Sequence, residues 1–274
     1  MPEAIDAAAI RANATEIAFE AGALLMEGFR GVSTARTKGA GGDLVTEYDE
    51  RCEVLLRERL AKLMPGAAFV GEEGGGDAGD GLAWHVDPID GTGNFAHGHP
   101  WFCLSLGLWG PAGGVAGVVH APAMGLTYSA SRGGGTTRNG VAVTVSDTDA
   151  LDQALLATGF PHDRASRPDK NYREFTSLDA RSHGVRRCAA AALELSIVAD
   201  GGYDGFWDQG LSSWDVAAAI VLIEEAGGKV SDLSGAALGL TPKVEILATN
   251  GRLHAPLKDA LAHVRALPPE TQVT

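Results

Sequence analysis

The sequence predicts a mixed fold in two halves, an α+β half over residues 1–148 and an α/β half over residues 149–274, joined in one compact unit around a shared cleft. In the first half, two helical segments precede short strand-like segments that Gly, Pro and Asn turns separate. In the second half strands and helices alternate, which is typical of helices packed on a sheet. With 274 residues, of which 45% are hydrophobic, the chain can bury a substantial core.

The first half begins with a predicted helix whose apolar face comprises Ile10, Ala14, Ile17, Ala21 and Leu24. A glycine-rich basic loop is expected over residues 28–42. A second helix is predicted over 47–64, because Thr46 and a carboxylate three residues later match a capping box and Pro65-Gly66 ends the segment. The strands that follow, as a mostly antiparallel sheet against these helices, are expected at 67–71, 82–86, 102–109, 114–120, 126–130 and 142–145.

The second half begins near Ser146–Leu151. Its helices are predicted near 169–181, 189–199 and 213–226. Its strands are predicted at 155–158, 185–187, 203–207, 229–231 and 246–248.

Charge, hydropathy and cysteine usage exclude several classes of protein. The formal net charge of −13 disfavours a nucleic-acid partner, because a phosphate backbone favours a basic surface. The longest strongly apolar run, Val216–Ile223, is far shorter than the roughly 18 residues that span a bilayer, and the charged N-terminal stretch does not match a signal peptide. Three widely spaced cysteines, Cys52, Cys103 and Cys188, indicate buried thiols in a reducing cytoplasm.

Four acidic clusters fall at the ends of predicted elements. They lie at 43–49 and 214–215, where helices start, and at 72–73 and 87–90, where strands end. Each cluster alone has an ordinary explanation, as a charge at a helix start or as a solvated turn. The position of all four at element ends predicts that they form one site.

The cluster at 87–90 carries the chemical argument. Pro88 keeps Asp87 extended and is expected to block further strand pairing, and the chain must then turn at Gly91, so Asp87 and Asp90 converge. Two adjacent carboxylates repel each other unless a cation lies between them, and oxygen ligands suit Mg²⁺. The N–H groups of Gly91 and Thr92, at the start of a short helical turn, would bind an anion beside the metal. A metal beside an amide anion site is the chemistry of phosphoryl transfer.

Five motifs in this order resemble the inositol monophosphatase family over roughly residues 5 to 265. They are Asp43-Leu44-Val45-Thr46-x-x-Asp49, Gly71-Glu72-Glu73, the run from Trp84 to Phe95, Trp214-Asp215-Val216-Ala217-Ala218, and Glu225-Ala226-Gly227-Gly228. The resemblance implies a layered αβαβα sandwich of the inositol monophosphatase and sugar phosphatase type. It also implies a homodimeric phosphomonoesterase that depends on two or three Mg²⁺ ions, for which Mn²⁺ could substitute, and that Li⁺ inhibits.

The resemblance also implies roles for individual residues. The metal ligands would be Glu72, Asp87, the carbonyl of Ile89, Asp90 and Asp215, with Glu72 shared by a third, weaker ion. Asp49 and Thr92 would orient and deprotonate the attacking water, with Glu72 counted among the catalytic groups and Glu73 behind the ligands. The substrate would be bound by Asp90, Gly91, Thr92, the main chain of Ala191, and Asp208. The loop that carries Lys38 would close over the site.

Three departures from the family pattern bear on the substrate rather than on the reaction. Gly93 stands where the family commonly has Thr, and Ala189-Ala190 stand where Gly-Ser or Gly-Thr is common, which removes a hydroxyl. Asp208 replaces a Glu that is one methylene longer. The resemblance makes inositol 1-phosphate the leading substrate, with histidinol phosphate and fructose 1,6-bisphosphate as alternatives.

Other functions fit the sequence less well. A haloacid-dehalogenase-type phosphatase needs two aspartates one residue apart, whereas Asp87 and Asp90 are three positions apart. A 3′-nucleotidase of the same superfamily commonly has Lys-Glu-Phe where this chain has Gly93-Asn94-Phe95. His97-x-His99 is expected to be a surface pair rather than a metal site. From a different class, the chain could be a non-catalytic dimeric interaction protein.

Overall fold

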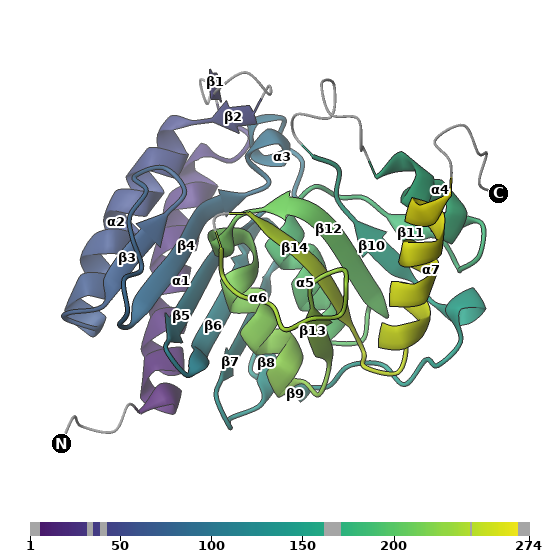
Figure 1. The fold of residues 1–274 in the computed structure, drawn as a ribbon. Coiled ribbons are helices and arrows are strands. Elements are labelled where there is room, and N and C mark those ends of the chain that lie inside the picture. Colours follow the sequence, from purple (N-terminus) through teal and green to yellow (C-terminus); the bar gives the residue numbers. More distant parts are fainter. Residues whose placement is uncertain (1–5, 32–34, 39–42, 162–170, 242, 268–274) are drawn as a thin grey trace.

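The computed structural model describes residues 6–31, 35–38, 43–161, 171–241 and 243–267. Helices and sheets alternate in five layers, with two outer helix pairs, two sheets and a central helix pair (Figure 1). The predicted αβαβα sandwich is confirmed.

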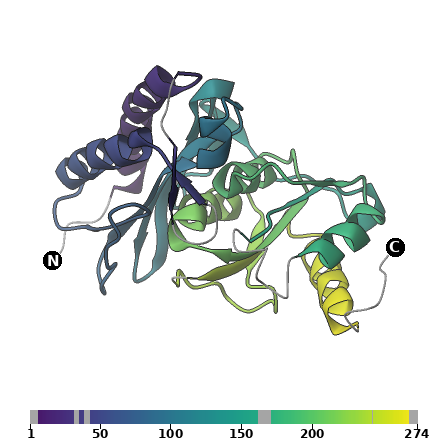
Figure 2. The ribbon, with the colours of Figure 1, turned by 90° about the horizontal axis from the view of Figure 1, so that it is seen from above.

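The first layer is formed by α1 (Ala7–Gly28) and α2 (Glu47–Leu63). The buried residues of α1 are Ile10, Ala14, Ala18, Ala21, Gly22, Leu25 and Gly28. Ile17 and Leu24 are only half-buried, so the buried face is rotated slightly from the predicted one. Strand β1 (Arg36–Lys38) lies in the basic loop and pairs with β2 (Asp43–Val45), directly after the loop, as a two-stranded antiparallel ribbon that the sequence did not suggest. This ribbon lies at the top of the molecule (Figures 1 and 2).

The second layer is a seven-stranded sheet in sequential order, antiparallel except for its first pair. Its strands are β3 (Ala68–Gly71), β4 (Ala83–Asp90), β5 (Cys103–Gly110), β6 (Gly113–Ala121), β7 (Leu126–Ser131), β8 (Thr136–Arg138) and β9 (Val141–Val143). One expectation was wrong: Pro88 does not end the strand pairing. The ladder resumes beyond a bulge, with Asp87 opposite Ser105 and Asp90 opposite Cys103.

The central layer consists of α5 (Ala191–Ala199) and α6 (Ser213–Glu225). Helix α6 is buried continuously over Val216–Ile223, because it packs against both sheets. Glycines of the first sheet permit this close approach: a Cβ at Gly117 would overlap the carbonyl oxygen of Ala218, and one at Gly107 would lie 2.7 Å from the Ala218 nitrogen. The apolar run in the sequence is therefore an internal helix.

The fourth layer is a five-stranded sheet in the order β11-β10-β12-β14-β13. Its strands are β10 (Leu156–Thr158), β11 (Val185–Arg186), β12 (Gly205–Leu211), β13 (Lys229–Ser231) and β14 (Val244–Thr249). The fifth layer is formed by α4 (Tyr172–Asp179) and α7 (His254–Ala266). Helix α7 was missed from the sequence, although Leu257, Ala260, Leu261 and Val264 follow helical spacing.

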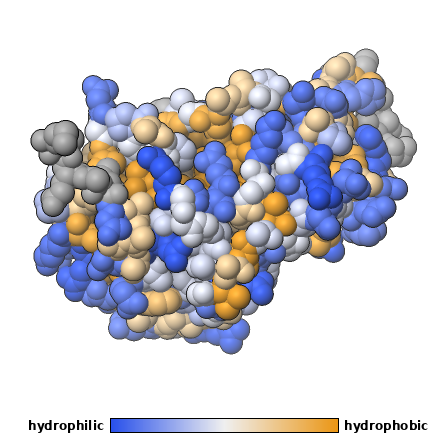
Figure 3. All heavy atoms as spheres, turned by 90° about the horizontal axis from the view of Figure 1, so that it is seen from below, coloured by the Kyte–Doolittle hydropathy of each residue, from blue (hydrophilic) through white to orange (hydrophobic). Residues whose placement is uncertain are grey.

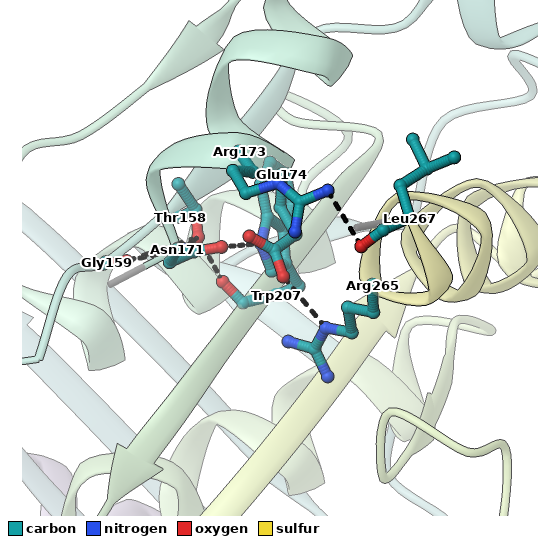
Figure 4. Close-up of polar contacts among 8 residues, drawn as sticks. All are labelled: Thr158, Gly159, Asn171, Arg173, Glu174, Trp207, Arg265 and Leu267. Atoms are coloured by element: carbon teal, nitrogen blue, oxygen red, sulfur yellow. Dashed lines mark hydrogen bonds and ion pairs between the residues drawn. The ribbon is translucent and has the colours of Figure 1, made fainter. Parts of the chain in front are cut away.

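The start of α4 is fixed to the sheet by Asn171 (Figure 4). Its side-chain amide donates to the Thr158 hydroxyl at 2.7 Å and to the Gly159 carbonyl at 2.7 Å. Its side-chain oxygen accepts from the Trp207 indole at 2.7 Å. These bonds join the end of β10 to the middle of β12, where Asp208 is the next residue after Trp207.

The prediction of three buried thiols is correct for two of the three cysteines. Cys52 and Cys103 are buried, but Cys188 is only half-buried, and all three thiols are free.

The large exposed apolar residues of the described chain are spread over α1, α2, β9 and α4: Phe19, Met26, Val54, Val141 and Tyr172. The face in Figure 3 accordingly mixes hydrophilic and hydrophobic residues. Within the described residues, no helix has the length and apolarity needed to cross a membrane.

Candidate active site

The acidic clusters lie close enough together to interact. Asp87, 2% exposed on β4, is hydrogen-bonded to the side chain of Glu72 from the turn after β3. Burial raises the pKa of Asp87 well above its ordinary range, and the charges of Glu72, Asp90 and Asp215 raise it further. Four carboxyl groups from three separate segments of the chain therefore form one group of interacting charges.

Asp49 and Thr92 are in direct contact, as the resemblance implied. Asp49 occupies the third position of α2, and its Oδ2 accepts from the backbone N–H and the hydroxyl of Thr46, at 2.7 and 2.6 Å. Its Oδ1 accepts from the Thr92 hydroxyl at 3.0 Å. Burial raises the pKa of Asp49 to about 6, against the opposing effect of these hydrogen bonds, and the charge of Glu73 adds to the rise.

Asp90, at the end of β4, faces the start of α5. Its two carboxylate oxygens accept from the N–H groups of Ala191 and Ala192, at 3.1 and 2.7 Å, and the Cys103 thiol lies 3.6 Å away. Burial raises the pKa of Asp90 to about 6, although these donors oppose the rise. The Ala191 main chain, expected to contact substrate, directs its N–H at Asp90.

Asp215, half-buried at the third position of α6, closes the group from the C-terminal half. Its Oδ2 accepts from the Ser212 N–H at 2.7 Å in a second capping box. Burial raises the pKa of Asp215 well above its ordinary range, and Asp90 and Glu72 raise it further. Two residues before it, the Ser213 hydroxyl pairs with His85 Nδ1 of β4 at 2.8 Å, so the strand that carries Asp87 is tied to the helix that carries Asp215.

The predicted turn after Asp90 is present. Gly91 has φ +89° and caps α3 (Thr92–Ala96), where a side chain would be strained. The Thr92 hydroxyl also lies 2.9 Å from the Ile89 carbonyl oxygen.

Two further predicted site residues belong to other elements of the fold. Asp208 is buried on β12, and its Oδ1 accepts a hydrogen bond from the Gln209 N–H at 2.6 Å. The side chain of Lys38 lies outside the described residues.

Similarity to known proteins identifies the family of this chain. A model of the inositol monophosphatase family matches residues 6–266. The chain belongs to the inositol monophosphatase family. An inositol-1-monophosphatase of Synechocystis sp. is 41% identical over 251 residues, 91% of this chain and 87% of that protein. A Pseudomonas aeruginosa protein named Nus factor SuhB is 42% identical over 199 residues, 70% of this chain and 73% of that protein.

A solved inositol monophosphatase from Anabaena has a TM-score of 0.87 to this structure at 37% identity, covering 97% of this chain and 99% of that one. The chain is accordingly a phosphatase of the inositol monophosphatase family, in the class of phosphoric monoester hydrolases.

Sequence reasoning missed two buried acidic residues beside the family motifs. Glu53 lies one helical turn after Asp49 and contacts the turn that carries Glu72. Glu194, 1% exposed on α5, accepts from the Cys188 N–H at 3.0 Å. Burial raises the pKa of Glu194 to about 8, and the charges of Asp90 and Asp208 contribute. The four-residue spacing from Asp49 was a usable signal for Glu53, whereas Glu194 had none.

The backbone at Ala189 was also missed. Ala189 has φ +63°, in the left-handed region where glycine is favoured. The family's common glycine at this position therefore has a structural reason, and this chain accepts strain there. The histidine pair agrees with expectation, since His97 and His99 are both exposed.

The donor set fits a hard cation. As the side chains stand, no three His, Cys, Asp or Glu groups among the described residues surround one point closely enough to hold a metal ion. Yet the charges of Glu72, Asp90 and Asp215 lie close enough to raise the pKa of Asp87, and every donor in the group is oxygen. Divalent cations relieve such repulsion, and oxygen donors favour Mg²⁺ over softer metals.

Proposed function

We propose that the chain hydrolyses phosphate monoesters, inositol 1-phosphate first among them, by Mg²⁺-dependent attack of a water molecule. The observation that carries this proposal is the group of carboxyls around Asp87 next to the hydrogen-bonded pair Asp49 and Thr92. A bound metal would neutralise phosphate charge and lower the pKa of water.

The ions would be held by Glu72, Asp87, the Ile89 carbonyl, Asp90 and Asp215, with Mn²⁺ a possible substitute and Li⁺ an inhibitor. Asp87, at the centre of the interacting charges, would be shared between two ions, and Glu72 would support a third. Glu73, near enough to raise the pKa of Asp49, would remain behind the ligands.

Thr92 and Asp49 would handle the proton of the attacking water. Because the Thr92 hydroxyl donates to Asp49 Oδ1, its oxygen is left to accept a hydrogen bond from water. The proton would pass from water to Thr92 Oγ1 while the Thr92 proton moves to Asp49 Oδ1. A pKa of about 6 suits Asp49 to this role, because the carboxylate is ionised at neutral pH and still basic.

The substrate would lie between the two halves of the chain. The Gly91 and Thr92 N–H groups would bind phosphate, with Asp90 beside them. Asp208 and the Ala191 main chain would contact the alcohol part of the substrate. Ala190 could not add the side-chain hydroxyl contact that a Ser or Thr at this position would make. The Lys38 loop would close over this arrangement.

A kinetic panel tests the substrate. Purified protein with Mg²⁺ is assayed for phosphate release from inositol 1-phosphate, histidinol phosphate and fructose 1,6-bisphosphate. We expect the highest kcat/KM for inositol 1-phosphate. A higher kcat/KM for either other compound would overturn the substrate assignment while leaving the reaction intact.

The relative named Nus factor SuhB is the observation that favours a second candidate, a dimeric interaction protein. This candidate would be favoured if the purified protein released no phosphate from any compound of the panel at any Mg²⁺ concentration. For either function we propose a cytoplasmic homodimer without nucleic-acid or membrane partners of its own.

A further inference from the structure

A buried carboxylate on α2 holds the turn that carries Glu72. Glu53, 4% exposed, reaches across to the turn after β3. Its Oε2 accepts from the Glu73 N–H at 2.8 Å, and its Oε1 accepts from the Gly74 N–H at 2.8 Å. Hydrogen bonds to an ionised acceptor are roughly twice as strong as neutral ones.

The turn is shaped around this carboxylate. A Cβ at Gly71 would overlap Oε2 of Glu53, and a Cβ at Gly74 would lie 2.6 Å from Oε1. The glycines on either side of Glu72-Glu73 thus leave room for the Glu53 side chain. The Glu72 N–H bonds to the Val86 carbonyl at 3.3 Å, which sets Glu72 beside the residue that follows Val86, Asp87.

The Glu53 side chain is itself held in place. Arg57, one helical turn further along α2, donates to Oε1 at 3.0 Å. The Arg57 guanidinium also lies over the Phe69 ring of β3, 4.0 Å from its centroid. A buried charge with a paired cation and two backbone donors avoids the cost of an unpaired one.

We propose that Glu53 is a positioning residue for the metal site. It fixes the backbone of the 72–74 turn and so aims the Glu72 carboxylate at Asp87. Asp49 and Glu53 are four residues apart on α2, so one helix sets both the proton acceptor and the Glu72 ligand. This inference rests on the proposed function, but Glu53 acts through backbone N–H groups and is not one of the proposed metal ligands or substrate contacts.

The first test is Glu53→Gln. The glutamine amide presents a donor to a turn N–H group that needs an acceptor, so one of the two backbone bonds is lost. We expect the affinity for Mg²⁺, measured by calorimetric titration, to fall by about 10–100-fold. The Mg²⁺ concentration for half-maximal phosphate release should rise in parallel, with the substrate KM at saturating Mg²⁺ changed less than about twofold.

Glu58→Gln is the matched control, because it removes the same charge from an exposed position of the same helix. Its Mg²⁺ affinity should equal that of the wild type. Gly74→Ala tests the same contact from the turn side and covers the case in which Glu53→Gln does not fold. Its control is Gly81→Ala, where a Cβ meets no atom within 4 Å.

We expect Gly74→Ala to weaken Mg²⁺ binding and Gly81→Ala to leave it unchanged. An unchanged Mg²⁺ affinity in folded Glu53→Gln or Gly74→Ala protein overturns the inference, as does a loss of thermal stability alone. Failure of the proposed function looks different: the wild type then binds Mg²⁺ without releasing phosphate, and the calorimetric comparison of Glu53→Gln still decides the role of Glu53.

Discussion

Glu194 illustrates what burial does to a single side chain. Its pKa of about 8 means that the folded protein keeps a proton that the unfolded chain releases near the ordinary glutamate pKa of 4.5. Stability from this group is thus complete below about 4.5 and is lost as the pH rises towards 8. The loss is on the order of 5 kcal/mol, because one pKa unit corresponds to about 1.4 kcal/mol.

Glu194→Gln should remove this share of the pH dependence. We expect the variant to gain stability relative to wild type between pH 5 and pH 8.5, since glutamine has no proton to lose in that range. Urea unfolding in EDTA at several pH values measures the difference. Parallel stability curves for the two proteins would contradict the assignment of a raised pKa to Glu194.

Ala189 provides a test of backbone strain. A left-handed alanine costs roughly 1–2 kcal/mol, and a glycine costs about 0.5–1 kcal/mol in the unfolded chain, so Ala189→Gly should raise the free energy of unfolding by up to about 1 kcal/mol. Ala180→Gly, at an exposed position with φ −69°, should lower it instead. Equal effects of the two substitutions in urea unfolding would argue against strain at Ala189.

At the residue scale, the sequence located the acidic groups better than their supports. The convergence of Asp87 and Asp90 was predictable from the strand and turn that carry them, and Asp49 was predictable only from its family motif. The contact between Glu53 and Gly74 joins a helix to a distant turn, and the φ of Ala189 depends on how α5 begins. The spacing from Asp49 indicates the face of α2 on which Glu53 lies, but neither the turn that Glu53 contacts nor the φ of Ala189 can be found from local sequence.

Elements were predictable where a local signal was strong. The Thr46 capping box and the apolar run of α6 were both correct. The strand through Pro88 was misjudged because a bulge absorbs the proline, and bulges depend on the partner strand. The β1–β2 ribbon has three residues per strand, too few for an alternating pattern to stand out.

The packing of α6 on the first sheet can be tested at Gly117. Gly117→Ala places a methyl group against the Ala218 carbonyl oxygen. Because both groups belong to the backbone or lie directly on it, α6 or the sheet must shift to relieve the overlap. We expect a loss of about 1–3 kcal/mol in the free energy of unfolding. Gly93→Ala, where no atom lies within 4 Å of the new Cβ, serves as the control and should not destabilise. Similar stability of both variants in urea would refute tight packing at this contact.

For the whole molecule, we propose that the halves 1–148 and 149–274 unfold together. The largest core cluster draws Val119 and Tyr128 from the first half and Leu195, Val216 and Ile246 from the second. Calorimetry should show one transition, with calorimetric and van't Hoff enthalpies that agree. Two resolved transitions would indicate independent domains.

The net charge of −13 also belongs to this scale. Six acidic residues of the proposed site contribute to it: Asp49, Glu72, Glu73, Asp87, Asp90 and Asp215. Two or three bound Mg²⁺ ions would offset much of that local charge, so an acidic protein could receive an anionic substrate.

The most direct test of the proposed mechanism is phosphate release from inositol 1-phosphate as a function of Mg²⁺ concentration, in wild type, Asp90→Asn and Asp215→Asn. Near-ultraviolet circular dichroism of each protein establishes that it is folded. We expect wild-type activity to vanish with EDTA and return with Mg²⁺, and both variants to fall by at least about a hundredfold, because each loses a metal ligand. Near-normal turnover in either folded variant would contradict the account.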